Sequence, residues 1–303
     1  MATGIIPIDK PQGWTSQDVA ARLRRVFQTR RIGHGGTLDP MATGVLPIFV
    51  GRATRAVEFF ESAQKEYIAT LRLGLLTDTQ DVTGRILETR PADVSPEALE
   101  AVLARFLGPQ MQVPPMYSAL KVNGQKLYEL AREGKEIERK AREIEIYDIR
   151  IVDIFPPDRA VIDVDCSKGT YIRTLCSDIG KKLGWGAYMS SLTRTASGRF
   201  LIEDAVKLDE LKEIAKNGGI DSVLITPDRA LADYKRITVG KKAEKYLYNG
   251  GKIYDRYFTC AAKPEINETV LGYDSNGRLV GIYTFLYDKE KDGFYIKPVR
   301  LML

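Results

Sequence analysis

The sequence predicts an α+β protein with a mixed, mostly antiparallel sheet and a small β-rich domain at its C-terminal end. Two observations favour this class. Segments typical of strands and of helices are interspersed along the 303 residues without the regular strand–helix–strand order that accompanies a parallel sheet. Near residues 226–228 the composition changes, and the rest of the chain holds nine of its 15 tyrosines in short strand-like segments. We therefore expect a larger domain over residues 1–228 and a smaller one over residues 229–303.

The N-terminal part of the chain predicts a glycine-rich loop between regular elements. Ser16 is a suitable cap for an amphipathic helix, and Val19 and Leu23 fall on its apolar face. The loop contains three glycines, which allow positive φ angles or a close approach of the backbone to another group. In order, we expect a strand, this helix, the loop, a buried strand and a second helix at residues 5–8, 16–28, 33–40, 45–50 and 52–62.

The middle of the chain predicts further strands and helices separated by turns. Ser95 and Pro96 start a helix, and Gly108 follows its end. A slip in the apolar alternation near Tyr147 indicates a β-bulge in a long strand. The predicted strands lie at residues 67–73, 85–88, 143–154 and 161–166, and the predicted helices at 96–106, 125–133, 170–182 and 208–217.

One polar segment predicts a mobile arm at about residues 123–142. Residues 134–143 have little apolar surface to bury, which favours a solvated conformation. Residues 116–121 could pair as a hairpin across Asn123-Gly124, but a helical pattern begins directly afterwards. We therefore expect a helix followed by a flexible stretch rather than a hairpin.

Positive charge is concentrated in three parts of the chain. The net charge is +5, and residues 229–303 account for all of it with 14 basic and nine acidic residues. Residues 10–55 hold eight bases against two acids, and residues 121–142 hold seven against four. A single basic run is usually a solvated face, but three separate patches favour a polyanionic partner such as RNA. The tyrosines of the last segment fit either an ordinary core or an RNA-stacking surface.

Several kinds of site have no support in the sequence. The three cysteines are odd in number and widely spaced, so we expect free thiols, and a single histidine argues against zinc. Phosphate-binding loops, dinucleotide-binding loops and serine-nucleophile elbows are missing, so we expect neither a cofactor nor a metal. The chain starts without a signal-peptide pattern and holds no apolar run of about 20 residues. We therefore expect a cytoplasmic protein without a membrane span.

Asp39 is the strongest candidate for chemistry. It lies in the glycine-rich loop directly before Pro40, which disfavours the α conformation at Asp39. A predicted buried strand anchors the loop, so a reactive group would stand on a shaped loop held by rigid structure. Taken alone, Asp39-Pro40 also fits an ordinary turn.

The surrounding motifs resemble one enzyme family. Residues 35–47, Gly-Gly-Thr-Leu-Asp-Pro-Met-Ala-Thr-Gly-Val-Leu-Pro, resemble the signature loop of the TruB family, the bacterial tRNA pseudouridine-55 synthases. Five other blocks resemble further motifs of that family in the same order, at residues 9–16, 65–67, 114–121, 166–175 and 191–195. The C-terminal segment resembles the small RNA-binding PUA domain that the family often carries.

The resemblance implies three catalytic residues. Asp39 would be the catalytic aspartate that acts on the target uridine, and Arg173 would pair with it to keep the carboxylate ionised and oriented. Tyr67 would stack on the extruded base, and its hydroxyl could take part in proton transfer at the new carbon–carbon bond. Whether the aspartate attacks the ribose or the base, or promotes loss of a ribose proton, stays open at this point.

Four more residues would contact the substrate or support the loop. Tyr171 and Leu192 would line the base pocket, although such residues also serve as ordinary core. Lys10 would support the catalytic loop or the RNA backbone. His34 would lie against the RNA and help to displace the target base, whereas a lone histidine is otherwise most often structural.

The resemblance thus implies an isomerase that flips the T-loop uridine at position 55 of tRNA into a pocket and converts it to pseudouridine without a cofactor. We expect a monomer that needs no obligate protein partner, with the arm closing on the RNA. The alternatives are an RNA-guided pseudouridine synthase of a related class and a non-catalytic RNA-binding or chaperone protein. Intact Asp39, Tyr67 and Arg173 favour catalysis, because binding alone needs no ion-paired carboxylate in a pocket.

Overall fold

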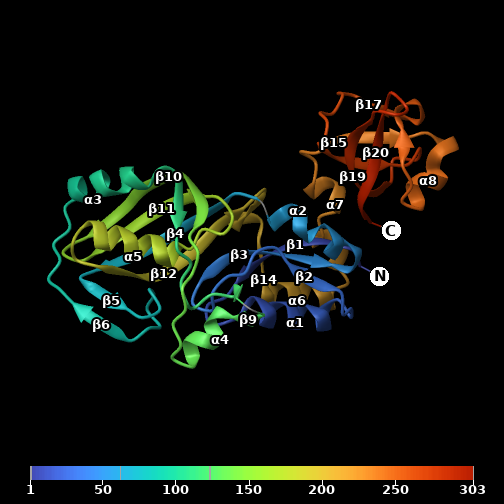
Figure 1. The fold of residues 1–303 in the computed structure, drawn as a ribbon. Coiled ribbons are helices and arrows are strands. Elements are labelled where there is room, and N and C mark those ends of the chain that lie inside the picture. Colours follow the sequence, from blue (N-terminus) through green and yellow to red (C-terminus); the bar gives the residue numbers. More distant parts are fainter. Residues whose placement is uncertain (1, 62, 123, 303) are drawn as a thin grey trace.

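The computed structural model describes residues 2–61, 63–122 and 124–302. A long body carries the C-terminal unit at one end (Figure 1). The two parts are built on separate sheets, one of ten strands and one of six. This arrangement confirms the predicted α+β class with a small β-rich part at the C-terminal end.

The ten-stranded sheet is mixed and mostly antiparallel, as predicted. Its strands follow the order β14-β1-β3-β12-β4-β11-β10-β7, with β2 beside β3 and β13 beside β12. Among the described pairs, only β1 with β14 and β3 with β12 run parallel. Their bounds are β1 Gly4–Lys10, β2 Ile32–His34, β3 Thr43–Val50, β4 Lys65–Leu73, β7 Gly108–Gln112, β10 Arg142–Phe155, β11 Arg159–Cys166, β12 Ala187–Ser197, β13 Phe200–Leu201 and β14 Val206–Lys207.

Helices and short hairpins complete the larger body. Apolar residues of α1, α5 and α6 belong to the same core as the inner face of the sheet. The α-helices of the chain are α1 Ser16–Val26, α2 Val57–Glu61, α3 Pro96–Leu103, α4 Leu127–Arg132, α5 Ile172–Lys182, α6 Leu208–Lys216, α7 Pro227–Ala230 and α8 Glu244–Tyr248. Two small hairpins pair β5 Leu75–Thr77 with β6 Ile86–Thr89, and β8 Lys121–Val122 with β9 Gln125–Lys126.

Most predicted elements are present, with corrections at several ends. The helix predicted over residues 52–62 begins as a 3-10 helix, η1 Gly51–Ala56, before α2, and residue 62 lies outside the described residues. Further 3-10 helices are η2 Ala104–Phe106, η3 Ile202–Asp204, η4 Ile220–Val223, η5 Lys241–Ala243 and η6 Asp255–Tyr257. The β-bulge near Tyr147 is confirmed by a register shift between Ile146 and Asp148.

The prediction that no hairpin forms around residues 121–126 is wrong. Strands β8 and β9 pair there, and α4 starts only at Leu127, because the first residues of the predicted helix belong to β9. Residue 123, the predicted start of the arm, lies outside the described residues. Residues 135–141 form neither helix nor strand, and their mobility stays a prediction.

The C-terminal sheet has the order β16-β20-β19-β18-β15-β17. It is largely antiparallel, with β15 and β18 as its parallel pair. Its last two strands, β19 and β20, contain tyrosines of the strand-like segments expected in this part of the chain. The bounds are β15 Lys235–Val239, β16 Ile253–Tyr254, β17 Phe258–Cys260, β18 Thr269–Tyr273, β19 Leu279–Asp288 and β20 Gly293–Leu301.

An apolar cluster joins the two parts of the molecule. Phe49 of β3 and Phe60 of α2 pack in the same cluster as Leu271, Tyr273 and Ile282 of the C-terminal sheet. Strand β3 therefore contributes one face to the core of the larger body and the other to this shared cluster. The C-terminal unit is docked on the larger body through buried side chains.

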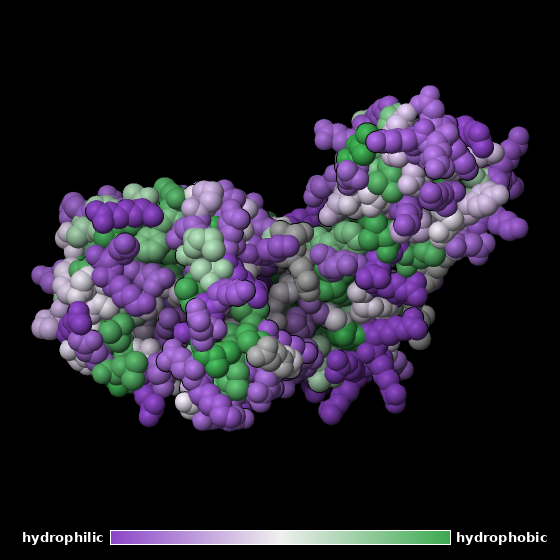
Figure 2. Space-filling model, in the orientation of Figure 1, coloured by the Kyte–Doolittle hydropathy of each residue, from purple (hydrophilic) through white to green (hydrophobic). Residues whose placement is uncertain are grey.

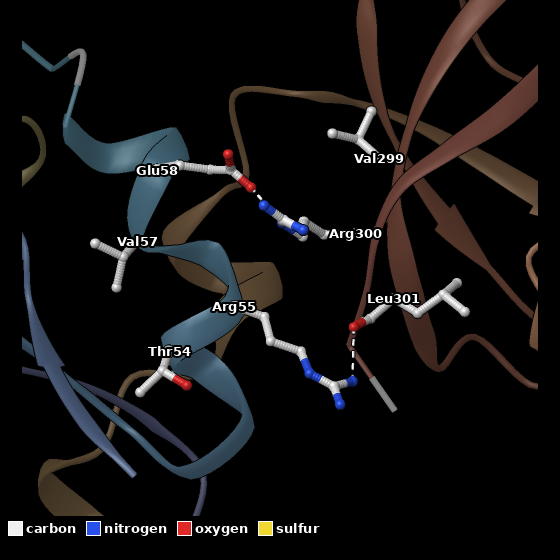
Figure 3. A pocket seen from close by; sticks show the side chains of 7 residues that line it. All are labelled: Thr54, Arg55, Val57, Glu58, Val299, Arg300 and Leu301. Carbon is white, nitrogen blue, oxygen red and sulfur yellow. Dashed lines mark hydrogen bonds and ion pairs between the residues drawn. The ribbon is translucent and has the colours of Figure 1, made fainter.

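A polar cavity of about 680 Å³ lies at the edge of this junction (Figure 3). Arg55 donates to the Leu301 carbonyl at 2.8 Å, and Arg300 pairs with Glu58. Both pairs are exposed, so each adds little stability compared with the shared apolar cluster. Figure 2 shows the junction as a notch between the two bodies and the C-terminal unit as largely hydrophilic on the side in view.

The cysteines are free thiols, as predicted, with Cys166 and Cys176 buried and Cys260 half-buried. Burial raises the pKa of the Cys166 thiol to about 12, so it is protonated at neutral pH. In the described part of the chain, no helix is long and apolar enough to cross a membrane.

Candidate active site

Asp39 lies on the loop between β2 and β3, and the first residue of α1 holds that loop in place. The Ser16 hydroxyl accepts a hydrogen bond from the Leu38 amide at 3.0 Å and donates one to the Leu38 carbonyl at 3.3 Å. The sequence predicts Ser16 as the helix cap, but the cap is Thr15, which forms a capping box with Asp18. The Ser16 side chain is therefore not needed as a cap, and it holds Leu38, the residue before Asp39, in place.

Arg173 and Asp39 form the predicted ion pair. The guanidinium Nε of Arg173 lies 2.9 Å from Asp39 Oδ2. The Arg173 side chain is 5% exposed and that of Asp39 is 36% exposed, so the arginine is buried behind a carboxylate that faces outwards. The ion pair fixes the orientation of a carboxylate that solvent can reach, which is a geometry that suits a catalytic aspartate.

Arg173 also forms an ion pair with a second carboxylate, that of Asp81. Its NH1 lies 3.4 Å from Asp81 Oδ2, and the guanidinium also donates to the carbonyls of Thr79 and Tyr117 at 3.2 and 2.8 Å. Asp81 is itself buried and accepts hydrogen bonds from the hydroxyls of Thr79 and Thr83. The guanidinium therefore has little freedom to rotate, and Asp39 is oriented through it.

The charges around Asp39 act in opposite directions on its pKa. Loss of water raises the pKa of the Asp39 carboxyl above its ordinary value; Arg173 opposes the rise, Asp81 adds to it, and Lys10 opposes it. Burial is the largest of these influences. The Asp39 carboxylate is partly exposed, but the protein around it still removes much of its water, and the two cations favour the ionised form against this effect.

Lys10 supports the Asp39 loop from inside the protein. It is fully buried, and its ammonium donates to the carbonyls of Trp14, Pro11 and Pro40 at 2.7, 3.0 and 3.3 Å. Burial lowers the pKa of Lys10 to about 8, and the positive charge of Arg194 contributes to the lowering. Of the two roles expected for Lys10, these contacts fit loop support, because the buried ammonium is already surrounded by carbonyls.

Tyr67 and Leu192 lie on adjacent central strands. On β4 and β12, Tyr67 is the register partner of Arg194, and Leu192 that of Ala69. Both Tyr67 and Leu192 are buried. Burial raises the pKa of the Tyr67 hydroxyl, and the neighbouring Arg194 opposes the rise.

Tyr171 precedes α5 and is held by a side-chain amide. Its backbone amide donates to Gln112 Oε1 at 2.8 Å, and its carbonyl accepts from Gln112 Nε2 at 3.1 Å. This pair of hydrogen bonds satisfies backbone groups at the start of the helix that carries Arg173. Burial raises the pKa of the Tyr171 hydroxyl, so this side chain is neutral and suited to an apolar pocket wall.

His34 ends β2, close to the glycine-rich loop. Its Nε2 lies 3.3 Å from Nε2 of Gln17 on α1. A groove of about 360 Å³ on the same helix is lined by Trp14, Arg22 and Arg25, among others. Asp18 also lines this groove, so its two arginines leave it with a net positive charge, which suits a nucleic-acid backbone.

Comparisons with known proteins agree with this geometry. A model described as TruB family pseudouridylate synthase (N terminal domain) matches residues 24–172, and one described as tRNA pseudouridylate synthase B C-terminal domain matches residues 173–232. The tRNA pseudouridine synthase B of Alkaliphilus oremlandii (strain OhILAs) is 41% identical over 299 residues, covering 99% of this chain and 98% of the relative. This chain belongs to the TruB family.

A further relative and two solved structures resemble this TruB-family chain as well. The tRNA pseudouridine synthase B of Oceanobacillus iheyensis is 46% identical over 253 residues, or 82% of this chain and 84% of the relative. A chain in the crystal structure of a Cbf5-Nop10-Gar1 complex superposes with a TM-score of 0.77 at 25% identity, covering 99% of this chain and 85% of that one. A structure of an H/ACA RNP bound to a substrate RNA containing 2'-deoxyuridine matches with a TM-score of 0.76 at 24% identity and shows the fold alone.

Three residues that contact the Asp39 loop or Arg173 were not singled out from the sequence. Asp81 precedes Val82-Thr83-Gly84, a sequence typical of an ordinary turn, Ser16 fits a helix cap, and Arg194 is only part of the block at residues 191–195. No local pattern marks them, because each acts through a partner distant in sequence. Strand β12, which carries Arg194, was not predicted either.

Proposed function

We propose that this protein converts the T-loop uridine of tRNA, position 55, to pseudouridine. The observation that carries the proposal is the outward-facing carboxylate of Asp39, fixed at 2.9 Å by a buried arginine. The named relatives in Alkaliphilus oremlandii and Oceanobacillus iheyensis support tRNA as the substrate. Because tRNA matures in the cytoplasm of bacteria, we infer that the protein works there.

In this proposal the target nucleotide leaves its stack and enters the pocket beside Asp39. Unstacking costs a few kcal/mol, which contacts to phosphates and to the flipped base offset. Tyr67 and Leu192 would contact the base, and Tyr171 would close the pocket. The glycosidic bond between N1 and the ribose breaks, and a bond forms between C5 and the same ribose carbon. The proton on C5 leaves and N1 gains a proton, so the nucleotide keeps its composition. Asp39 acts on the nucleoside in its ionised form, which Arg173 stabilises.

We assign catalysis to residues 1–228 and RNA binding to residues 229–303, with the arm at about 123–142 closing on the RNA. Cation–aromatic contacts on the C-terminal unit support a binding role. The Lys252 ammonium lies 4.7 Å from the ring centre of Tyr295, and Lys291 lies 4.9 Å from that of Tyr254. Such rings offer stacking surfaces to unpaired bases, and the cations offer contacts to phosphates.

The decisive experiment compares the wild-type protein with Asp39→Asn on an unmodified tRNA transcript. We expect pseudouridine at position 55 alone with the wild type and none with the variant, because asparagine cannot supply the carboxylate. The affinity for tRNA should stay close to that of the wild type. Position-resolved mapping of pseudouridine and a binding titration measure the two quantities. Full activity of the variant would remove Asp39 from the chemistry.

The same experiment separates the alternatives. The solved relatives in H/ACA complexes favour an RNA-guided synthase as the second candidate. We propose instead a monomer that needs neither guide RNA nor protein partner, so purified protein and tRNA should suffice. A requirement for an added guide would support the second candidate. Binding without any modification would support the non-catalytic RNA-binding or chaperone alternative.

A further inference from the structure

A second buried arginine lies next to the catalytic site. Arg194, on the central strand β12, is 1% exposed. Among the described residues it forms no ion pair with an acidic side chain, in contrast to Arg173, which has two. A buried charge is costly unless hydrogen bonds compensate it, so its partners indicate what it does.

The partners of Arg194 lie at the two ends of the Asp39 loop. Its Nε donates to the Val45 carbonyl at 2.7 Å, and its NH2 donates to the Gly36 carbonyl at 3.1 Å. One planar guanidinium thus connects residue 36, before the aspartate, with residue 45, after it. The chain between these points contains Asp39, and residues 36–42 belong to no strand, because β3 begins only at Thr43.

The backbone of Arg194 fits the loop as closely as its side chain. Arg194 is the register partner of Gly44 on the parallel strand β3. A Cβ atom on Gly44 would lie 2.2 Å from the Arg194 carbonyl oxygen, and Gly44 has a φ of 97°. Only glycine permits both this approach and this conformation. The loop is therefore seated directly on β12 at this point.

Arg194 also connects the loop to Tyr67. The two residues face each other across β12 and β4, and the guanidinium charge acts on the tyrosine hydroxyl. Lys10 meanwhile holds the middle of the loop at Pro40. Two buried cations thus hold the loop at both ends and in the middle, and one of them faces the tyrosine of the base pocket.

We propose that Arg194 is a positioning residue for the pseudouridine synthase reaction, which sets the distance between Asp39 and Tyr67 by tying both ends of the Asp39 loop to β12. This inference rests on the proposed function. Its role differs from that of Arg173, because Arg194 acts on the backbone of the loop and not on the carboxylate.

The test uses Arg194→Met, Arg194→Lys and the control Arg72→Lys, an exposed arginine on β4 paired with Asp158. We expect the methionine variant to bind tRNA with wild-type affinity and to react about 100-fold more slowly under single-turnover conditions, because a misplaced group costs about this factor. The lysine variant should recover part of the rate, and the control should react normally. Amide hydrogen exchange of residues 36–45 should increase in Arg194→Met only.

The pH profile adds a measurement that a general loss of stability would not change. Because Arg194 contributes to the lowered pKa of Lys10, its removal should move any alkaline decline of the rate to higher pH, and Arg194→Lys should not. Wild-type rate and wild-type exchange in Arg194→Met would overturn the positioning role. If the wild type itself forms no pseudouridine, the proposed function fails, and the exchange measurement still decides whether Arg194 fixes the loop. If the methionine variant does not fold, the uncharged Arg194→Gln takes its place in the same comparisons, with the same expected results.

Discussion

At the scale of single residues, the site depends on buried cations whose partners are mostly carbonyl and carboxylate oxygens. Arg173 fixes the carboxylate, Lys10 the middle of the loop and Arg194 its ends. The sequence indicated Asp39, Arg173 and Tyr67 through their motifs. It did not indicate that Asp81 shares Arg173, because a carboxylate in a turn looks the same whether it faces water or a buried guanidinium.

Lys10 leads to a prediction about pH. Its pKa of about 8 means that the ammonium loses one of three N–H donors above that pH, and the Asp39 loop loses support. We expect the single-turnover rate of the wild type to decline above about pH 8. Lys10→Met should react slowly at every pH and show no decline there. A wild-type rate that stays constant to pH 9.5 would contradict this role.

The same group has a defined effect on stability. The pKa of Lys10 is about 8 in the folded chain and 10.5 in the unfolded chain, so the unfolded chain binds more protons between these values. The free energy of unfolding therefore gains a contribution from Lys10 as pH rises from 8 to 10.5. Urea unfolding of wild type and Lys10→Met at pH 7.5 and pH 10 measures this difference, with the methionine variant as the control.

At the scale of elements, apolar patterning predicted the longer strands β1, β3, β4, β10 and β11 of the large sheet. Strand β12 and the short strands β2, β7, β13 and β14 were not predicted. Strand β10 alternates clearly and was predicted with its bulge. Strand β12 lies in the centre of the sheet, but it carries Ser190, Ser191 and the buried Arg194, which a search for apolar alternation does not select. Its polar residues serve contacts with β3 and β4 that only the folded sheet provides.

The start of α1 offers a matched pair of variants. Thr15 is exposed and caps the helix, whereas Ser16 is buried and holds Leu38. We expect Thr15→Ala to lower the free energy of unfolding by about 1 kcal/mol and to leave the rate nearly unchanged. Ser16→Ala should slow the single-turnover reaction roughly 10- to 100-fold with little loss of helix. Circular dichroism, urea unfolding and single-turnover assays separate the two effects. Equal rates in both variants would contradict the proposal that Ser16 holds the Asp39 loop in place.

At the scale of the whole molecule, the two-part organisation was predictable, but the way the parts join was not. The change in composition near residues 226–228 predicted a separate β-rich unit. Which faces of β3 and β18 meet in one apolar cluster depends on packing between distant segments, and no local pattern encodes it. The C-terminal unit therefore contributes to the stability of the larger body through this cluster.

This junction predicts coupled unfolding. Leu271 lies in the shared cluster, and both tryptophans, Trp14 and Trp185, lie in the larger body. We expect Leu271→Ala to lower the free energy of unfolding by roughly 2 to 5 kcal/mol. Tryptophan fluorescence should report this loss at the same urea concentration as circular dichroism. An unshifted fluorescence transition would show that the two parts unfold independently.

Strand β3 has a consequence for how this protein can change over generations. Ile48 belongs to the core of the larger body, and its neighbour Phe49 to the cluster shared with the C-terminal unit. Because both faces of the strand are packed, a larger or smaller side chain on β3 requires a compensating substitution in the core on that side. Divergence should therefore be slowest here and faster on β10, whose outer residues face solvent.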